Sequence, residues 1–324
     1  MENQAKPAPE RCVATIDVGT NTALLLISAW QSGKLSVLHD ETRFVRLGEG
    51  VDSAGVVNQA ALDRLVKTLN AYNVVLEDYD VEDIIIGATS ASRDAQNKAE
   101  LIEYVKQQTG LTYGIISGVE EAEWSFAGVA AGLDSSDEPL LSIDIGGGST
   151  EFTLGHVNPA SPAIDTAVSL DIGSVRLTEK FFATQPPSQQ MIDEAQAWLR
   201  QQMSRLSNAY QKQTAQLVGA SGTTTVLGLL ELEAKGQALH DLSVQQALLG
   251  YISKARVSAW KHALLEMTKD EVLALNPALM KGREDVYPAG ILMLDLIMET
   301  LNKESVLVNT WGLRHGLALR YWTR

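Results

Sequence analysis

Two short segments of the chain combine an aspartate with a small-residue turn, a combination that can bind phosphate and a metal ion. Residues 16–22 are Ile-Asp-Val-Gly-Thr-Asn-Thr, and residues 143–149 repeat the pattern as Ile-Asp-Ile-Gly-Gly-Gly-Ser. Each follows an apolar run and leads into an alternating apolar segment, which predicts a strand, a tight turn and a returning strand. Glycine lets the turn backbone approach a ligand, and an aspartate at the strand end can hold a metal ion or a water. The repeat therefore predicts a cleft that holds phosphate from both sides.

The backbone amides of the two turns are the predicted phosphate-binding groups. Three consecutive glycines cost chain entropy and exceed what a plain hairpin turn needs, so close approach of a ligand explains the second turn better. We expect these amides to come from Gly19, Thr20 and Asn21 in the first turn and from Gly146, Gly147, Gly148 and Ser149 in the second.

Two carboxylates flanking the second turn are candidate ligands for Mg²⁺ or another divalent cation. Asp144 ends one predicted strand and Glu151 begins the returning one, so the pair could face one ion from both arms of the hairpin. Hard divalent cations prefer carboxylate oxygens together with water and substrate phosphate. A lone glutamate in a strand is otherwise simply a residue that faces solvent. Asp17 holds the equivalent place in the first turn and is a further candidate for positioning metal or water.

Arg93 is the candidate side chain for holding phosphate. It follows a run of small residues near the start of a predicted helix, where a guanidinium can bind a phosphate beside helix N–H groups. The alternative is a surface salt bridge with Asp94 or Glu100. Arg43 and Arg46 follow the third predicted strand and are further candidates, which could extend a path for a polyanion.

Glu120 and Glu121 open a predicted helix and could supply a general base. Hydrolysis of a phosphoanhydride needs a water aligned with the terminal phosphorus, and a nearby carboxylate can orient that water and accept its proton. Acids in the first turn of a helix also interact favourably with the helix dipole, which suits Glu120 better than Glu121. From the residues alone, these two explanations are equally good.

A third small-residue turn, Ala-Ser-Gly-Thr-Thr at residues 220–224, follows a predicted strand and opens a helix. A helix N-terminus of this kind can hold an anion, so Gly222 and Thr223 are further candidates. The histidines show no metal-ligand spacing, and we assign them no chemistry. They are His39, His156, His240, His262 and His315.

The composition excludes several functional classes. With 26 basic and 40 acidic residues the formal net charge is −14, and no basic run with aromatic residues offsets it, so we expect no nucleic-acid partner. No stretch approaches the roughly 18 uninterrupted apolar residues of a membrane span, so we expect no membrane association. Cys12 is the only cysteine and cannot form an internal disulfide. We expect a cytoplasmic protein whose ligand, if anionic, is bound in a small positive cleft.

The apolar pattern predicts an α/β protein with two related halves. A chain of 324 residues is long enough for two domains. Both halves begin with three strands followed by helices, and the loop at residues 134–139 is the predicted boundary between a domain of residues 1–133 and one of residues 134–324. Residues 1–11 are expected to be a short disordered leader. We expect strands at residues 13–18, 23–30, 35–39, 84–86, 113–116, 140–145, 151–155, 163–170, 216–219 and 305–308. We expect helices at residues 62–69, 95–109, 175–182, 192–210 and 313–321. A further helix is expected to begin near residue 120, and most of 242–302 is expected to be helical.

A duplicated β-β-β-α-β-α unit with Asp-x-Gly turns resembles the actin, sugar kinase and Hsp70 superfamily. Within it, the ordered set of motifs resembles the exopolyphosphatase and guanosine pentaphosphate phosphatase family, in its short form that ends after the two domains flanking the phosphate cleft. Single glycine turns are common, whereas seven motifs in order are specific. These motifs lie at residues 16–22, 88–95, 116–122, 144–151, 173–179, 219–223 and 312–316.

The resemblance implies two actin-like (ribonuclease H-like) domains with mixed five-stranded sheets flanked by helices and a cleft between the domains. It also implies a helical insertion in the second domain and a last helix that packs back on the first. The implied reaction is Mg²⁺-dependent release of terminal orthophosphate from inorganic polyphosphate, with Glu121 as the general base and Arg93 associated with phosphate. A homodimer is a further expectation.

Three other functions stay open at this stage. Hydrolysis of guanosine pentaphosphate cleaves the same kind of bond, and motifs do not separate it from polyphosphate hydrolysis. An ATP-dependent small-molecule kinase is favoured by Gly222 and Thr223, which match a turn that contacts nucleotide in kinases of the superfamily. A catalytically silent polyphosphate or nucleotide sensor is suggested by His315, which stands between Arg314 and Gly316 where family members commonly carry an acidic residue.

Overall fold

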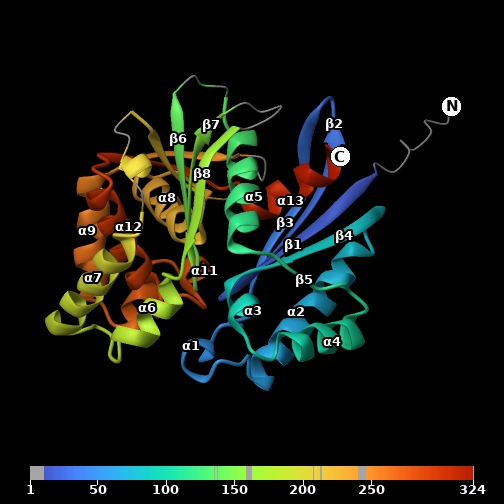
Figure 1. Ribbon diagram of the computed structural model, residues 1–324, viewed down its shortest axis with the longest axis horizontal. Helices are drawn as coiled ribbons and strands as arrows, with labels where there is room; N and C mark the ends of the chain where they lie inside the picture. The colour runs from blue at the N-terminus through green and yellow to red at the C-terminus, as the bar shows by residue number, and fades with distance from the viewer. Residues whose placement is uncertain are drawn as a thin grey trace.

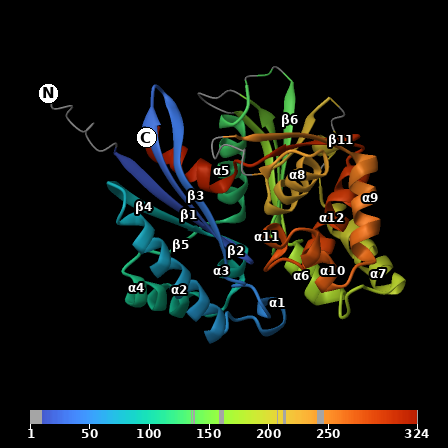
Figure 2. The same ribbon diagram turned by 180° about the vertical axis from the view of Figure 1, so that it is seen from behind.

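The computed structural model describes residues 11–134, 136, 138–157, 163–206, 208–211, 214–239 and 246–323. They form two lobes, each built around one mixed β-sheet (Figures 1 and 2). Among these residues, no helix has the length and apolar character that crossing a membrane would require.

The first lobe contains a five-stranded sheet in the order β3-β2-β1-β4-β5. Strand β1 pairs antiparallel with β2 and parallel with β4, so the sheet is mixed. The strands are β1 (Cys12–Val18), β2 (Thr22–Gln31), β3 (Lys34–Phe44), β4 (Val81–Ala88) and β5 (Gly114–Ile115), and the helices are α1 (Val51–Ala54), α2 (Gln59–Leu76), α3 (Ser90–Asp94) and α4 (Lys98–Thr109). The single helix expected at residues 95–109 is thus preceded by the separate short helix α3.

The second lobe contains six strands, not the five that were expected, in the order β10-β11-β9-β6-β7-β8. The additional strand is β10 (Leu248–Ser253), an edge strand inside the segment expected to be mostly helical. It is short and contains Gly250 at a φ of +98°, so its apolar pattern is too brief to distinguish from a helix. The other strands are β6 (Pro139–Ile145), β7 (Thr150–His156), β8 (Ala163–Leu170), β9 (Gln216–Gly219) and β11 (Ser305–Asn309).

Helices of the second lobe pack on its sheet and on one another. The helix expected at 192–210 ends at Met203 and is followed by a separate 3₁₀ turn, Asn208–Gln211. Part of the helical expectation for 242–302 falls on residues 242–245, which lie outside the described residues, as does His240. The helices are α6 (Ser174–Phe181), α7 (Gln189–Met203), α8 (Gly222–Ala234), α9 (Lys254–Leu265), α10 (Lys269–Leu275), α11 (Pro277–Met280) and α12 (Tyr287–Thr300).

Two helices lie between the sheets and join the lobes (Figures 1 and 2). Helix α5 (Gly118–Ala131) packs on β6, β7 and β8 of the second sheet, although it precedes that sheet in sequence. Helix α13 (Leu313–Trp322), the last of the described chain, packs on β1 and β2 of the first sheet and against α5. The division at residues 133 and 134 stays a prediction, because helices from both sides of it cross between the sheets.

The packing of α5 against α13 requires glycine. A Cβ at Gly316 would lie 1.8 Å from the carbonyl oxygen of Trp124, and one at Gly128 would lie 2.1 Å from that of Gly312. Both distances are far shorter than atoms can approach, so the two helices touch through backbone. This contact holds α5, and every side chain on its inner face, in a fixed relation to both sheets.

Candidate active site

A cavity of about 400 Å³ lies between the two lobes and is bordered by both predicted phosphate turns. Glu121 reaches it from α5, and the first turn of α8 borders it at Ser221 to Thr223. The last motif reaches it through Gly312 and Arg314. Side chains from distant parts of the sequence thus meet at one place, where the carboxylates of Asp17, Asp144 and Glu121 are all on the wall.

The two turns have the same local geometry. The Gly19 N–H donates to the Thr22 carbonyl at 2.8 Å, and the Gly146 N–H donates to the Ser149 carbonyl at 3.0 Å. A Cβ at Gly148 would lie 2.4 Å from Ser90 Oγ. The absence of a side chain at Gly148 therefore allows the two lobes to approach closely, as well as allowing a ligand to approach the turn.

Glu121 is buried at the N-terminal end of α5, where its charge is poorly solvated. The side chain is 8% exposed, and its Oε2 accepts a hydrogen bond from Arg93 Nη1 at 2.9 Å. Burial raises the pKa of Glu121 from 4.5 to about 7, and the guanidinium of Arg93 acts in the opposite direction. A carboxyl group with such a pKa can accept a proton near neutral pH.

Glu120 has a different environment, although it is the neighbouring residue. Its Oε2 accepts hydrogen bonds from the backbone N–H and the hydroxyl of Ser117, both at 2.9 Å. The first of these bonds and the bond from the Glu120 N–H to Ser117 Oγ, at 3.2 Å, form the capping box of α5. The bonds that Oε2 accepts lower the pKa of Glu120. Glu120 does not border the cavity, so its geometry fits a helix-capping role. Glu121 borders the cavity and makes no capping bond to any described residue, so helix capping does not explain it.

The carboxylates of Asp144 and Glu151 lie opposite each other on neighbouring strands. They are direct partners in the antiparallel β6–β7 register, so both side chains project from the same face of the sheet. Asp144 borders the cavity, while Glu151 is 2% exposed and accepts a hydrogen bond from Ser169 Oγ at 2.7 Å. Glu151 is therefore buried and not the solvent-facing strand residue that its position alone would suggest.

Burial, and for most of them a neighbouring carboxylate charge, raises the pKa of these carboxyl groups. Burial is the largest cause for Asp17, Asp144 and Glu151, and the pKa of Asp144 rises to about 6. The charges of Glu121 and Asp144 further raise the pKa values of Asp17 and Glu151. Such a group of carboxylates is favourable for binding a cation.

The oxygen atoms of Asp144 and Glu151 fit a hard divalent cation in chemical type. Within the described ranges of the chain, however, no three carboxylate, imidazole or thiol groups converge closely enough to hold a metal ion by themselves. An ion at this place would need oxygen atoms from water or substrate to complete its coordination, as Mg²⁺ commonly does.

Arg93 forms its ion pair with Glu121 and not with Asp94 or Glu100, the two partners of the alternative surface salt bridge. It donates to Glu121 and to the Ile116 carbonyl, the latter at 3.2 Å, and forms no ion pair with Asp94 or Glu100 in the described structure. It lies behind Glu121 and does not border the cavity wall. As the structure stands, Arg93 contacts the candidate base directly.

Arg43 and Arg46 do not border the cavity. Arg43 Nε donates to Glu41 at 2.6 Å and its guanidinium lies over the ring of Tyr72. Arg46 forms a bidentate ion pair with Asp285 across the lobes: Nη1 donates to Oδ1 at 3.2 Å and Nη2 donates to Oδ2 at 2.5 Å. Their role along a polyanion path stays a prediction, and both have acidic partners that a polyanion would have to displace.

Arg283 borders the cavity and was not among the residues expected from the sequence. Its Nη1 donates to the Gly222 carbonyl at 3.4 Å, and its guanidinium lies 5.0 Å from the ring centre of Phe44. Its buried Nε has no hydrogen-bond partner in the described part of the chain, and burial lowers its pKa. Arg283 and Gly222 are 61 residues apart, so no local pattern could indicate this cation.

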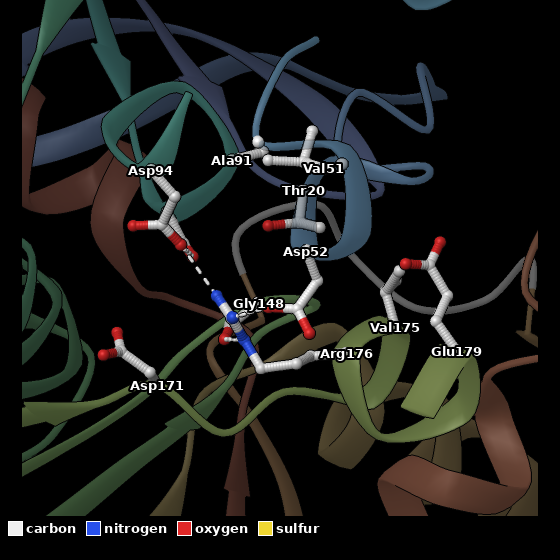
Figure 3. A pocket seen from close by; sticks show the side chains of 13 residues that line it. Thr20, Val51, Asp52, Ala91, Asp94, Gly148, Asp171, Val175, Arg176 and Glu179 are labelled. Atoms are coloured by element: carbon white, nitrogen blue, oxygen red, sulfur yellow. Dashed lines mark hydrogen bonds and ion pairs between the residues drawn. The ribbon is translucent and has the colours of Figure 1, made fainter. Parts of the chain in front are cut away.

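A second cavity, of about 250 Å³, adjoins the first (Figure 3). Thr20, Ser90 and Gly148 border both cavities, so the two turns separate them. Arg176 of α6 pairs there with Asp94 at 2.7 Å and with Asp52, and thereby connects the lobes. This arginine lies in one of the motifs, but its sequence position gave no indication of a bridge between lobes.

His315 is buried beside the cavity wall without bordering it. Its Nδ1 accepts a hydrogen bond from the Gly312 N–H at 3.3 Å, and its ring stacks on Trp311 with centres 4.7 Å apart. Burial lowers the pKa of His315 well below its ordinary value, so the ring is neutral. The residue supports the start of α13, and its neighbours Gly312 and Arg314 form the cavity wall.

The chain is similar to known proteins along most of its length. The profile described as "Ppx/GppA phosphatase family" matches residues 26–324. The chain is 32% identical to Exopolyphosphatase 2 of Mycobacterium tuberculosis over 321 residues, which are 95% of this chain and 97% of that protein. It is 31% identical to the bifunctional 3-dehydroquinate synthase/phosphatase of Fusobacterium nucleatum over 307 residues, which are 91% of this chain but only 44% of that protein.

Solved structures confirm the expected class of fold. A crystal structure of an exopolyphosphatase from Cytophaga hutchinsonii superposes with a TM-score of 0.87 and 28% identity, covering 96% of this chain and 97% of the other. The Aquifex aeolicus member of the Ppx/GppA protein family superposes with a TM-score of 0.77 and 28% identity, covering 97% and 98%. The two-lobed arrangement and its mixed sheets are those of this group of structures.

Proposed function

Because the chain belongs to the Ppx/GppA phosphatase family, we propose that it is an exopolyphosphatase, which hydrolyses the terminal phosphoanhydride bond of inorganic polyphosphate. The observation that carries this proposal is the position of Glu121. A buried carboxyl group with a pKa of about 7 borders a cavity whose walls include two phosphate-type turns. The names of the mycobacterial relative and of the Cytophaga structure support the same substrate.

Glu121 acts as the general base in this proposal. Its carboxylate accepts the proton of the attacking water and orients that water toward the terminal phosphorus. The ion pair with Arg93 favours the ionised form, and a phosphate that attracts Arg93 would free one oxygen of Glu121. Activity should therefore rise with pH through about 7, as Glu121 becomes ionised.

Asp144 and Glu151 would hold a divalent cation, with Asp17 nearby on the other lobe. When bound, the cation stabilises negative charge that develops on the phosphoryl oxygens. The Gly19 and Gly146 amides are used by the turn hydrogen bonds, so the amides that hold the phosphates are those of Thr20 and Asn21 and of Gly147 to Ser149. They do so without mobile side chains that would have to be ordered.

Arg283 supplies a cationic contact on the cavity wall. A buried guanidinium without a carboxylate partner in the described structure is costly, and a phosphate would remove that cost. The first turn of α8, with Gly222 and Thr223, offers N–H groups beside it. This proposal gives the cavity a cation beside the first turn of α8.

Hydrolysis of guanosine pentaphosphate is a second candidate, favoured by one feature of the cavity. Part of its wall is apolar, formed by Phe44, Leu229, Leu279 and Val286. A polyphosphate chain carries a charge on every unit and gains nothing from such a surface, whereas a nucleoside does. The ring of Phe44 and the guanidinium of Arg283 could hold a base.

One experiment separates these functions. Phosphate release is measured with long polyphosphate, triphosphate, guanosine pentaphosphate and ATP, each with and without Mg²⁺. The proposal expects Mg²⁺-dependent release, fastest with long polyphosphate and absent with ATP. Faster release from guanosine pentaphosphate would favour the second candidate, transfer from ATP to an acceptor would indicate a kinase, and binding without turnover would indicate a sensor. A cytoplasmic homodimer stays a prediction, which fractionation and light scattering would check.

A further inference from the structure

Ser125 is a buried hydroxyl on α5 that the proposed mechanism does not use. It is 2% exposed and lies one helical turn after Glu121, so both side chains project from the same face of the helix. That face lies against the second sheet, where α5 contacts β6, β7 and β8. Thr153 of β7 donates to the Ala122 carbonyl at 3.2 Å and fixes this turn of the helix.

The hydroxyl of Ser125 is directed away from its own helix. A serine inside a helix commonly donates to the carbonyl four residues earlier, which here belongs to Glu121. Ser125 Oγ instead donates to Asp144 Oδ2 at 3.1 Å. Alanine would suit a buried helix position better than serine by a few tenths of a kcal/mol. Helix formation therefore does not explain the hydroxyl.

Asp144 depends on this one contact for its orientation. In the described parts of the chain, Ser125 is the only side chain that donates a hydrogen bond to Asp144, and Asp144 forms no ion pair at 4.0 Å or less. Oδ1 has no side-chain donor among the described residues, so it is the oxygen more open to a ligand. The bond thus selects one orientation of a carboxylate on the cavity wall.

We propose that Ser125 is a positioning residue, which directs Asp144 toward a divalent cation and holds that carboxylate at a fixed place relative to Glu121. The base and the positioning hydroxyl are on one helix face, so a shift of α5 would move both together. This inference rests on the proposed function, because it assumes that Asp144 is a ligand of the cation.

The test measures cation binding directly and does not depend on turnover. Mn²⁺ binding to the full-length protein without substrate is followed by electron paramagnetic resonance for wild type and for Ser125→Ala, Ser125→Thr and Ser28→Ala. Ser28 is the matched control: it is fully buried on β2, and its hydroxyl has no partner in the described structure. Thermal unfolding of all four proteins without metal establishes that they fold.

We expect Ser125→Ala to raise the Mn²⁺ dissociation constant about tenfold, as the loss of a supporting hydrogen bond to a metal ligand typically does. Its unfolding temperature should fall slightly, because the loss of this hydrogen bond exceeds the gain in helix propensity, and the protein should remain folded. Ser125→Thr, which keeps the hydroxyl, should restore much of the affinity, and Ser28→Ala should bind as wild type does. Equal Mn²⁺ affinity of Ser125→Ala and wild type would overturn the proposal.

The outcome for wild type separates this inference from the proposed function. If wild type binds Mn²⁺ and releases phosphate but Ser125→Ala matches it in both, only the positioning role is wrong. If wild type neither binds Mn²⁺ nor hydrolyses polyphosphate or guanosine pentaphosphate, the proposed function is wrong and the role of Ser125 is wrong with it.

Discussion

The two hairpins that border the cavity have the same backbone and different side chains. Asp17 and Asp144 occupy equivalent places, and each glycine turn closes with an equivalent hydrogen bond. The residue opposite the aspartate differs, because Asp17 pairs with Leu24 on β2 whereas Asp144 pairs with Glu151 on β7. The second hairpin therefore carries a pair of carboxylates on one face, and the first carries only one.

This difference shows that a repeated fold need not repeat its chemistry. A second carboxylate adds negative charge where Asp144 is already buried, which is costly unless a cation is near. Leu24 at the equivalent place adds no charge. The first hairpin suits phosphate and the second suits a cation, and the candidate base, Glu121, belongs to neither.

The largest expected effect tests whether the base lies outside both hairpins. Glu121→Gln removes the proton acceptor and keeps the shape of the side chain. We expect kcat on polyphosphate to fall by about 10²–10⁴-fold, the usual contribution of a general base, with little change in KM. Glu120→Gln is the matched control: glutamine can also complete the capping box, so helix stability and kcat should both stay nearly unchanged. Near wild-type phosphate release by Glu121→Gln would refute the assignment.

The next effect tests the second hairpin directly. Glu151→Gln makes its charge equal to that of the first hairpin. We expect the Mg²⁺ concentration for half-maximal activity to rise by about 10²-fold, because loss of a ligand should exceed the loss of a supporting contact. Glu138→Gln, at an exposed position just before the same sheet, should not change it. An unchanged Mg²⁺ requirement in Glu151→Gln would remove the distinction between the hairpins.

A smaller effect concerns Arg283, the cation on the cavity wall beside Gly222 and Phe44. Arg283→Ala should raise KM for polyphosphate about tenfold with little loss of kcat, because Arg283 contacts neither the candidate base nor the candidate cation ligands. Arg283→Lys should recover part of the affinity, and Arg200→Ala, at an exposed position on α7, should have no effect. A loss for guanosine pentaphosphate that clearly exceeds the loss for polyphosphate would favour the nucleotide as substrate.

The smallest effect is on stability without metal. Burial raises the pKa of Glu121 to about 7 in the folded protein, against an ordinary value of 4.5, so this group binds more protons in the folded state between these values. The contribution of Glu121 to stability is therefore fully present below pH 4.5 and is lost as pH rises through about 7. Glu121→Gln removes this dependence and should be more stable than wild type at pH 8, by on the order of 1 kcal/mol. Chemical denaturation at pH 5 and pH 8 would measure it, and a difference that grows toward low pH would contradict the sign.

Local pattern was sufficient for features formed by neighbouring residues. Both glycine turns, their flanking strands and the start of α5 at Ser117 depend on short-range sequence, and the structure has them in place. Strand β10 was missed because Gly250 interrupts a short apolar run. Its pairing with β11, more than 50 residues away, is what makes it a strand.

Contacts between distant segments were beyond any local pattern. Arg283 meets Phe44, Arg176 meets Asp94 and Ser125 meets Asp144 only because the lobes and the helices between them pack as they do. The expected salt-bridge partners of Arg93 were its sequence neighbours, whereas its actual partner is Glu121, 28 residues later.

The amino-acid sequence by itself determined the duplicated hairpins, the carboxylates at their strand ends and the acidic start of α5, because these depend on residue type and on contacts within a few residues. Only the tertiary structure decided which glutamate is buried beside the cavity, which arginine on the cavity wall lacks a carboxylate partner among the described residues, and where α5 lies between the sheets. The physical reason is that burial and charge coupling depend on what surrounds a side chain in space. The chemistry of Glu121 and Glu120 differs for this reason alone, since the two residues are identical in type and adjacent in sequence.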